Sequence, residues 1–180
     1  MVKASSKTIE ELPPYDPKTN ALNVLIDTPK GSRNKFKYNE DIGLYQLRGV
    51  LPAGSIFPFD FGFIPSTKGG DGDPLDILIL MDAPAFTGCL ITARLIGVIK
   101  AEQTEDGKTN RNDRLIGTAI VSSTENEIHS LSDLNDRLID EIEYFFISYN
   151  KIKGKEFKLL ERGGSSEAFK IVQEADITNR

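Results

Sequence analysis

The segment that most constrains the fold is an acidic loop followed directly by an apolar run. The loop reads Asp71-Gly72-Asp73-Pro74-Leu75-Asp76, and the run reads Ile77-Leu78-Ile79-Leu80-Met81. An uninterrupted apolar run of this length fits a strand that is buried on both faces. Gly72 favours a turn and Pro74 stiffens the chain, so we expect the loop to deliver its aspartates together to the mouth of that strand.

Crowded carboxylates favour a bound cation. Two unit charges about 4 Å apart repel by about 1 kcal/mol in water and by about 4 kcal/mol at an effective dielectric constant near 20. Oxygen ligands without a nearby His or Cys favour Mg²⁺ or Mn²⁺ over zinc. Because Mg²⁺ usually completes its shell with waters and substrate phosphates, the loop indicates phosphate chemistry. A solvated acidic turn is the alternative interpretation of a bare D-x-D-x-x-D motif.

Length and composition exclude several classes of protein. At 180 residues the chain fits one domain, and we expect residues 21–180 to form it, preceded by a polar, proline-punctuated arm over residues 1–20. A formal net charge of −5 argues against a nucleic-acid binder, and no apolar window is long enough to span a membrane. The single cysteine, Cys89, indicates a reducing compartment. We therefore expect a soluble cytoplasmic protein.

The hydrophobic pattern alternates with a period of two through the first two thirds of the chain and with a helical period only later. Strands are expected at 22–27, 35–38, 44–50, 77–81, 90–100 and 114–121. A helix is expected from a cap at Ser132 to a stop at Gly154, and a second from about Ser166 to Ala175. Short strands followed by helices predict an α+β, mainly β fold: a small barrel with two helices outside it.

Further charged residues could join the acidic loop if the strands bring them there. Asp27 closes the first strand, and a second acidic group comprises Glu102, Glu105, Asp106 and Asp113. Two metals held by such acids could activate a shared water and clamp a phosphorus atom. Cations available for phosphate oxygens are Lys35, Lys37, Arg48, Arg114 and Lys151. For each acid taken alone, a solvent-facing loop position is the alternative.

Other site motifs fail on their spacing. A catalytic triad or a histidine metal site would rest on the only histidine, His129, which lies in a polar segment. Lys30-Gly31-Ser32 lacks the glycine spacing of a P-loop. An EF-hand beginning at Asp71 would place Leu75 at a ligand position and Asp76 at the obligatory glycine.

Over residues 22–160 the chain resembles the soluble family I inorganic pyrophosphatases. The acidic loop matches that family's signature, and its flanks agree: Asp27-Thr28-Pro29-Lys30-Gly31-Ser32 with Lys35, Phe57-Pro58-x-x-Phe61-Gly62-Phe63-Ile64-Pro65, and Phe145-Phe146-x-x-Tyr149. The resemblance implies a five-stranded, closed, OB-like barrel and Mg²⁺-dependent hydrolysis of pyrophosphate to two phosphates. It also implies a homo-oligomer, often a hexamer in bacterial members.

The resemblance assigns roles to the acids. Asp71 and Asp76 would be metal ligands, and Asp73 would be the base that deprotonates a metal-bridging water. Asp27 stands where the family has a glutamate that acts through metal-bound waters. For the second acidic group the family's pattern falls on Asn112, so we expect Asp113 to take over with the loop in a shifted register, and Asp106 rather than Glu105 to be the other ligand.

The resemblance also assigns the phosphate-binding groups, with several departures. Lys35 and Tyr149 would hold phosphate, and Arg114 replaces a lysine with the same task. The family's phosphate-binding arginine aligns with Gly49, and strand alternation turns the neighbouring Arg48 to the opposite face unless a bulge intervenes. Asn150 replaces a lysine beside Lys151, Phe61 replaces a tyrosine, and Lys37 stands where an acid is common.

These observations favour an Mg²⁺-dependent inorganic diphosphatase that binds pyrophosphate and phosphate. Two alternatives stay open: a weak or silent homologue that only binds phosphate or metal, and a hydrolase of another phosphoanhydride with a pocket widened at Gly49 and Phe61. A single-strand nucleic-acid binder would need a basic groove, which this acidic chain does not indicate.

Overall fold

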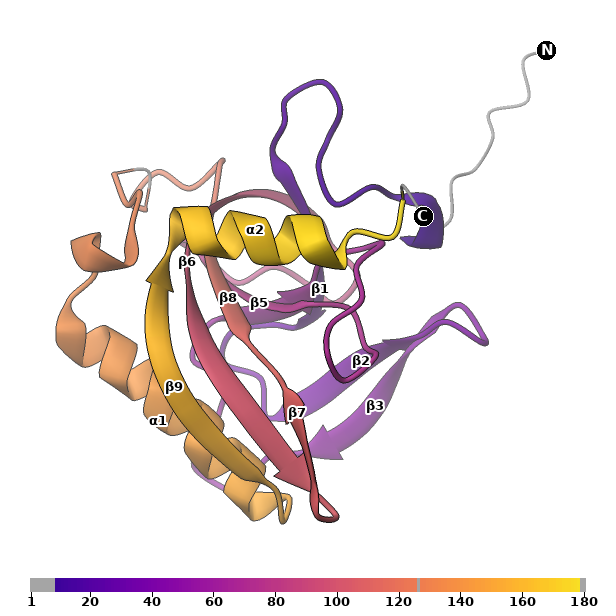
Figure 1. Ribbon diagram of the computed structural model, residues 1–180, viewed down its shortest axis with the longest axis vertical. Coiled ribbons are helices and arrows are strands. Elements are labelled where there is room, and N and C mark those ends of the chain that lie inside the picture. Colours follow the sequence, from indigo (N-terminus) through magenta and orange to yellow (C-terminus); the bar gives the residue numbers. More distant parts are fainter. Residues whose placement is uncertain (1–8, 126, 179–180) are drawn as a thin grey trace.

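The computed structural model describes residues 9–125 and 127–178 and is mainly β, with two helices in its C-terminal half (Figure 1). Five strands close into a ring, each hydrogen-bonded to the next and the last to the first, in the order β1 (Leu22–Thr28), β4 (Asp60–Phe63), β5 (Asp76–Leu80), β8 (Arg114–Ala119), β6 (Leu90–Glu105). Neighbours in the ring are antiparallel except β5 and β8, which are parallel. The predicted fold class, with its closed set of five strands, is confirmed.

Two strands outside the ring extend its sheet, and two others form a separate hairpin. β9 (Glu156–Gly164) pairs antiparallel with the long β6, and β7 (Lys108–Arg111) folds back on the end of β6. β2 (Asn34–Asn39) and β3 (Leu44–Val50) form a separate hairpin that projects beside the ring (Figure 1). Side chains of the hairpin, such as Lys37 and Arg48, line a cavity together with Asp73 from the loop between β4 and β5.

The β5 strand is buried on both faces, as its apolar run predicts. Ile77 and Ile79 belong to one core cluster, which α2 (Ser165–Ala175) covers with Ala168 and Val172. Alternate residues Leu78 and Leu80 belong to a second cluster, which α1 (Asp136–Ile152) joins through side chains such as Phe146. Side chains alternate with a period of two along a strand, so one apolar strand serves two cores. Asp76, at its first residue, is thereby held in a fixed position.

Both predicted helices are present, but the expected cap of the first is wrong. Ser132 lies in a short 3-10 helix, η2 (Leu131–Asp133), whereas Asn135 precedes α1 and accepts a hydrogen bond from Arg137 N at 2.9 Å. Asn135 can cap because its own backbone is extended while the following residues are helical. After α1, Gly154 adopts a left-handed conformation with φ +74°, as expected of a helix stop.

The predicted N-terminal arm is described only in part, because residues 1–8 lie outside the described residues. A one-turn 3-10 helix, η1 (Ile9–Glu11), opens the described part. Beyond it, Pro13 O and Pro14 O accept hydrogen bonds from Asn23, and Tyr15 pairs with Leu22. The described part of the arm therefore lies against β1. Between residues 9 and 178, residue 126 aside, no helix combines the length and apolarity needed to cross a bilayer.

Candidate active site

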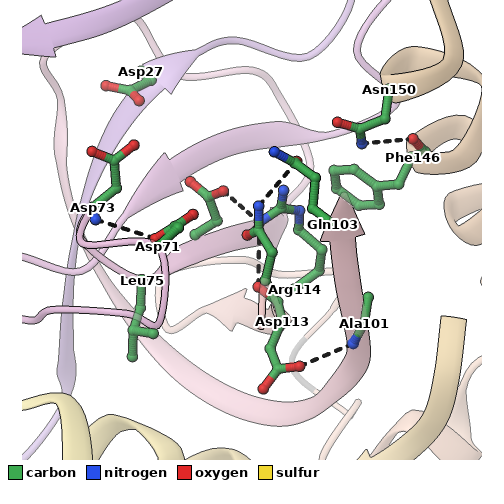
Figure 2. Close-up of polar contacts among 12 residues, drawn as sticks. Asp27, Asp71, Asp73, Leu75, Ala101, Gln103, Asp113, Arg114, Phe146 and Asn150 are labelled. Carbon is green, nitrogen blue, oxygen red and sulfur yellow. Dashed lines mark hydrogen bonds and ion pairs between the residues drawn. The ribbon is translucent and has the colours of Figure 1, made fainter. Parts of the chain in front are cut away.

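The acidic loop connects β4 to β5 and is held by its own backbone. Gly69 N donates to Asp73 O at 2.7 Å, and Gly72, at φ +90°, makes the tight turn between them. The Asp73 amide also donates to Asp71 Oδ1 at 3.1 Å (Figure 2). These bonds fix Asp71 and Asp73 beside each other, and Asp76 follows as the first residue of β5.

The loop acids line one cavity of about 170 Å³ at the mouth of the ring, together with Asp27 from the end of β1. Figure 2 shows Asp27, Asp71 and Asp73 on the same side of Arg114. Burial, and then repulsion by Asp76 and Asp73, raises the pKa of the Asp71 carboxyl. The structure therefore brings together the four acids that the first strand and the loop supply.

Lys35, from β2, enters the same cavity from the hairpin side. Its Nζ lies 3.9 Å from Asp27 Oδ2 and 4.0 Å from the centre of the Phe61 ring. Burial raises the pKa of Asp27 to about 7, with Lys35 opposing the rise. Burial likewise lowers the pKa of Lys35 to about 8 against the attraction of Asp27. Phe61, which stands where the family has a tyrosine, thus presents its ring face to the Lys35 ammonium group, and this cation–π contact is stabilising.

Ion pairs hold two of the loop acids. Lys37 Nζ lies 2.5 Å from Asp73 Oδ2, at the boundary with a second cavity of about 320 Å³ under the hairpin. Arg114, which is buried, places Nη1 2.5 Å from Asp76 Oδ2 and packs its guanidinium on the rings of Phe146 and Phe157. Each of these two carboxylates therefore has a cation of this chain beside it.

Two amide side chains, those of Asn112 and Gln103, form another part of the cavity lining, the amide wall. Arg114 Nη1 also donates to Asn112 Oδ1, and Asn112 Nδ2 donates to Gln103 Oε1 at 3.1 Å (Figure 2). Asn112 precedes β8, and Gln103 lies on β6. Neither Gln103 nor this pairing was predicted from the sequence.

The second acidic group lies elsewhere. Asp113 turns away from the cavity, where its Oδ1 accepts from Ala101 N at 2.9 Å and from Arg111 Nε at 2.6 Å (Figure 2). Asp106 is exposed at the turn between β6 and β7, at φ +50°, and Glu105 forms an ion pair of 2.6 Å with Lys155. Asp113 instead lines a different cavity, of about 460 Å³, with Asp71 and Asp76, whereas Asp106 and Glu105 line neither this cavity nor the 170 Å³ one.

The predicted phosphate-binding groups are divided between two cavities. Lys35, Arg114 and Tyr149 line the 170 Å³ cavity, and Lys151 is exposed outside it. Arg48 lines the 320 Å³ cavity. The bulge that it needs is present, because the hairpin register passes from Lys35 opposite Gly49 to Phe36 opposite Leu47 and leaves Arg48 unpaired.

The C-terminal end of α1 supplies a lysine that sequence reasoning missed. Lys153 Nζ donates to the Tyr149 hydroxyl at 2.5 Å and lies 4.3 Å from the centre of that ring. Burial and the charge of Asp76 raise the pKa of Tyr149 to about 12. Asn150 instead turns back to donate to Phe146 O at 2.8 Å. The sequence did offer a signal for Lys153: it lies four residues after Tyr149, and residues i and i+4 share a helix face.

The donor set of the acidic wall fits a hard dication. It consists of carboxylate oxygens from Asp27, Asp71, Asp73 and Asp76, which suit Mg²⁺ and Mn²⁺. Across the described residues, no three acidic, His or Cys side chains form a ready-made metal-binding group. Lys37 and Arg114 pair with two of the carboxylates instead, and burial, followed by the charges of Asp76 and Asp73, raises the pKa of the Asp71 carboxyl.

The fold and the site together define a class of protein: it is mainly β, and its pocket combines carboxylates with buried cations. Such a pocket suits a dication bound together with a small polyanion. The family model described as inorganic pyrophosphatase matches residues 24–178. The chain therefore belongs to the inorganic pyrophosphatase family, and membership implies a divalent metal cofactor.

Individual relatives agree. The chain is 38% identical to the inorganic pyrophosphatase of Synechocystis sp. over 147 residues, which cover 82% of this chain and 85% of the relative. It superposes on the crystal structure of the inorganic pyrophosphatase from Thermus thermophilus with a TM-score of 0.85 and 30% identity, over 94% of this chain and 97% of that one. For the Neisseria gonorrhoeae inorganic pyrophosphatase the TM-score is 0.83 at 34% identity, over 93% and 95% of the two chains.

Proposed function

We propose that this chain is an inorganic diphosphatase that hydrolyses pyrophosphate to two phosphates with Mg²⁺, and that Mn²⁺ can replace Mg²⁺. The relatives named above carry that activity in their names. The observation that carries the proposal is the meeting of Asp71, Asp73 and Asp76 with Lys35 and Arg114 in one cavity. Pyrophosphate is a compact polyanion, and such a cavity offers it cations on one side and sites for dications on the other.

Asp71, Asp76 and Asp27 are the proposed metal ligands. Their carboxylates face one cavity, and Asp71 and Asp27 both have a raised pKa because of burial. Bound Mg²⁺ would neutralise phosphate charge and acidify a water molecule at the acidic wall. Asp76 is also tied to Arg114, so the same carboxylate positions a phosphate-binding cation.

Asp73 is the proposed general base. Its side chain is exposed to the cavity and lies on a loop whose backbone bonds fix it next to Asp71. A base must reach the proton that it accepts, and a loop carboxylate at the mouth of the cavity can reach a water there. Lys37 Nζ lies 2.5 Å from this carboxylate and helps to orient it.

Lys35, Arg114 and Tyr149 are the proposed ligands of the phosphate oxygens in the 170 Å³ cavity. They would neutralise the leaving phosphate as charge develops on it, and one preorganised donor of this kind is typically worth about 10²- to 10³-fold in rate. Arg48 would bind at the far end of the neighbouring cavity. Lys151, Asp106 and Asp113 stay predictions from the sequence, because they lie outside the 170 Å³ cavity.

The test is phosphate release from pyrophosphate with Mg²⁺, measured for the wild type and for Asp73→Asn. We expect turnover in the wild type and a loss of about 10²-fold or more in the variant, since a positioned base contributes about 10²- to 10⁴-fold. Binding of pyrophosphate without turnover in the wild type would identify a silent binding homologue instead. Equal turnover by both proteins would contradict the role of Asp73.

A hydrolase of a larger phosphoanhydride is the second candidate. The observation in its favour is the 320 Å³ cavity, which shares Asp27, Lys37, Asp73 and Asp76 with the first and adds Arg48. Comparing kcat/KM for pyrophosphate with that for a nucleoside triphosphate separates the two candidates.

Assembly and location are part of the same proposal. We propose a homo-oligomer, with a hexamer as one form, working in the cytoplasm; the single cysteine agrees with a reducing compartment. Light scattering coupled to size-exclusion chromatography tests the assembly.

A further inference from the structure

The amide wall of the cavity offers hydrogen atoms, not lone pairs, to whatever binds there. The Arg114 guanidinium can only donate, so Asn112 must present Oδ1 to it whichever way the amide is drawn. Asn112 Nδ2 then faces Gln103, which must accept with Oε1. Asn112 Oδ1 and Gln103 Oε1 therefore both accept hydrogen bonds from this chain. The Gln103 amino group is the part of the amide wall that can donate to a ligand.

The charged group in contact with this wall is a guanidinium. Arg114 is 4% exposed and contacts both Asp76 and Asn112, so its guanidinium is held between the acidic wall and the amide wall. A dication needs oxygen lone pairs and is repelled by a guanidinium, whereas a phosphate oxygen is attracted to both donors.

The acids nearest this wall already have partners in this chain. Asp113 accepts from the backbone of Ala101 and from Arg111, in a separate cavity of about 460 Å³, and Glu105 pairs with Lys155. Asp106 is exposed at the turn beyond β6. Asn112 and Asp113 lie in the two-residue link between β7 and β8, where the Asn112 side chain contacts Arg114 and the Asp113 side chain contacts Arg111.

We propose that metal binding is confined to the acidic wall, and that Gln103, with Arg114, binds a phosphate oxygen directly on the amide wall. The proposal rests on the proposed function for the identity of the ligand. It predicts fewer bound dications than a cavity with acids on both walls would hold, and it makes Gln103 a substrate-binding residue.

The first test counts bound Mn²⁺ by electron paramagnetic resonance titration without substrate. The double variant Gln103→Glu/Asn112→Asp converts the amide wall into an acidic one, and we expect it to bind at least one more Mn²⁺ than the wild type. Gln173→Glu makes the same chemical change on exposed α2 and is expected to leave the count unchanged. Equal counts for the wild type and the double variant would overturn the proposal.

A second variant keeps the proposal testable if the double variant does not fold. Asp106→Asn removes an acid from the β6–β7 turn, and we expect the wild-type Mn²⁺ count. Loss of a bound Mn²⁺ would show that the turn acids do hold a metal, which contradicts confinement to the acidic wall.

The third measurement addresses phosphate. Gln103→Leu removes the amino group, and we expect the Kd for inorganic phosphate in saturating Mg²⁺ to rise about 10-fold while the Mn²⁺ count stays at the wild-type value. An unchanged Kd for phosphate would overturn the role of Gln103. If the wild type failed to hydrolyse pyrophosphate, the proposed function would fall, yet the Mn²⁺ counts would still decide where metals bind.

Discussion

Replacing the buried lysine of the cavity should stabilise the unliganded fold while it weakens substrate binding. The pKa of Lys35 falls from the ordinary 10.5 to about 8 because burial outweighs the attraction of Asp27. At about 1.4 kcal/mol per pKa unit, keeping this side chain charged costs the folded state about 3 kcal/mol. Lys35→Met removes that cost and keeps an apolar side chain against Phe57 and Phe61.

Removing Lys35 adds little to the free-energy cost of burying Asp27 at neutral pH. The pKa of Asp27 is already about 7, so without Lys35 its carboxyl takes up a proton, and the cost of burying it does not grow further. We therefore expect Lys35→Met to raise the free energy of unfolding by about 3 kcal/mol at pH 7, or the Tm by about 6 to 12 °C, in metal-free buffer.

The pH dependence of this gain has a definite sign. Between about pH 8 and pH 10.5 the folded protein binds fewer protons at Lys35 than the unfolded chain does. The penalty is therefore complete below about pH 8 and disappears as the pH rises toward 10.5. The advantage of Lys35→Met should shrink over the same window.

The assays are urea denaturation with EDTA and, separately, the KM for pyrophosphate with Mg²⁺. Losing one charged hydrogen-bond donor to phosphate should raise KM about 10- to 100-fold. Lys30→Met, on an exposed residue of the neighbouring loop, should change stability by less than about 0.5 kcal/mol. A Lys35→Met protein that is less stable than the wild type in metal-free buffer would refute this reasoning.

Three further predictions concern one residue of the site and two residues that hold the fold. Tyr149→Phe should reduce kcat/KM about 10-fold because a phosphate-facing hydroxyl is lost, while Tyr144→Phe, exposed on the same helix, should not. Asp82 accepts hydrogen bonds from the backbone amides of Ser123 and Thr124, and the bonds from this loop hold its pKa below the ordinary 3.8. Asp82→Asn should therefore lower the Tm at pH 7. The difference in Tm from the wild type should narrow once the pH falls below about 4. Gly62→Ala should lower the yield of folded protein in expression trials, because its Cβ would lie 2.1 Å from Leu25 O and force β4 away from β1.

Local sequence patterns predicted the parts of the fold that local patterns determine. The apolar run after Asp76 gave β5, and helical spacing gave α1 and α2. β9 was missed because, as an outer strand on β6, it buries few side chains and shows no clean alternation. The cap of α1 was misplaced because Ser132 begins no helix of its own and Asn135, three residues on, has the extended backbone that a cap needs.

Prediction of the site succeeded where the residues are neighbours in sequence. Asp71, Asp73 and Asp76 share one loop, so their meeting needed no knowledge of the fold. The amide wall depends on where β6 ends, and β6 continues to Glu105, beyond the expected end near residue 100. Gln103 therefore lies inside the strand and faces the cavity, which the composition of the segment could not reveal.

Calorimetric titration of Mg²⁺ tests the central claim most directly: the acids on either side of Pro74 bind dications. We expect the wild type to bind Mg²⁺ and Asp71→Ala/Asp76→Ala to lose that binding, while Asp136→Ala, on an exposed residue of the first turn of α1, retains it. Unchanged Mg²⁺ uptake by the double alanine variant would contradict the account.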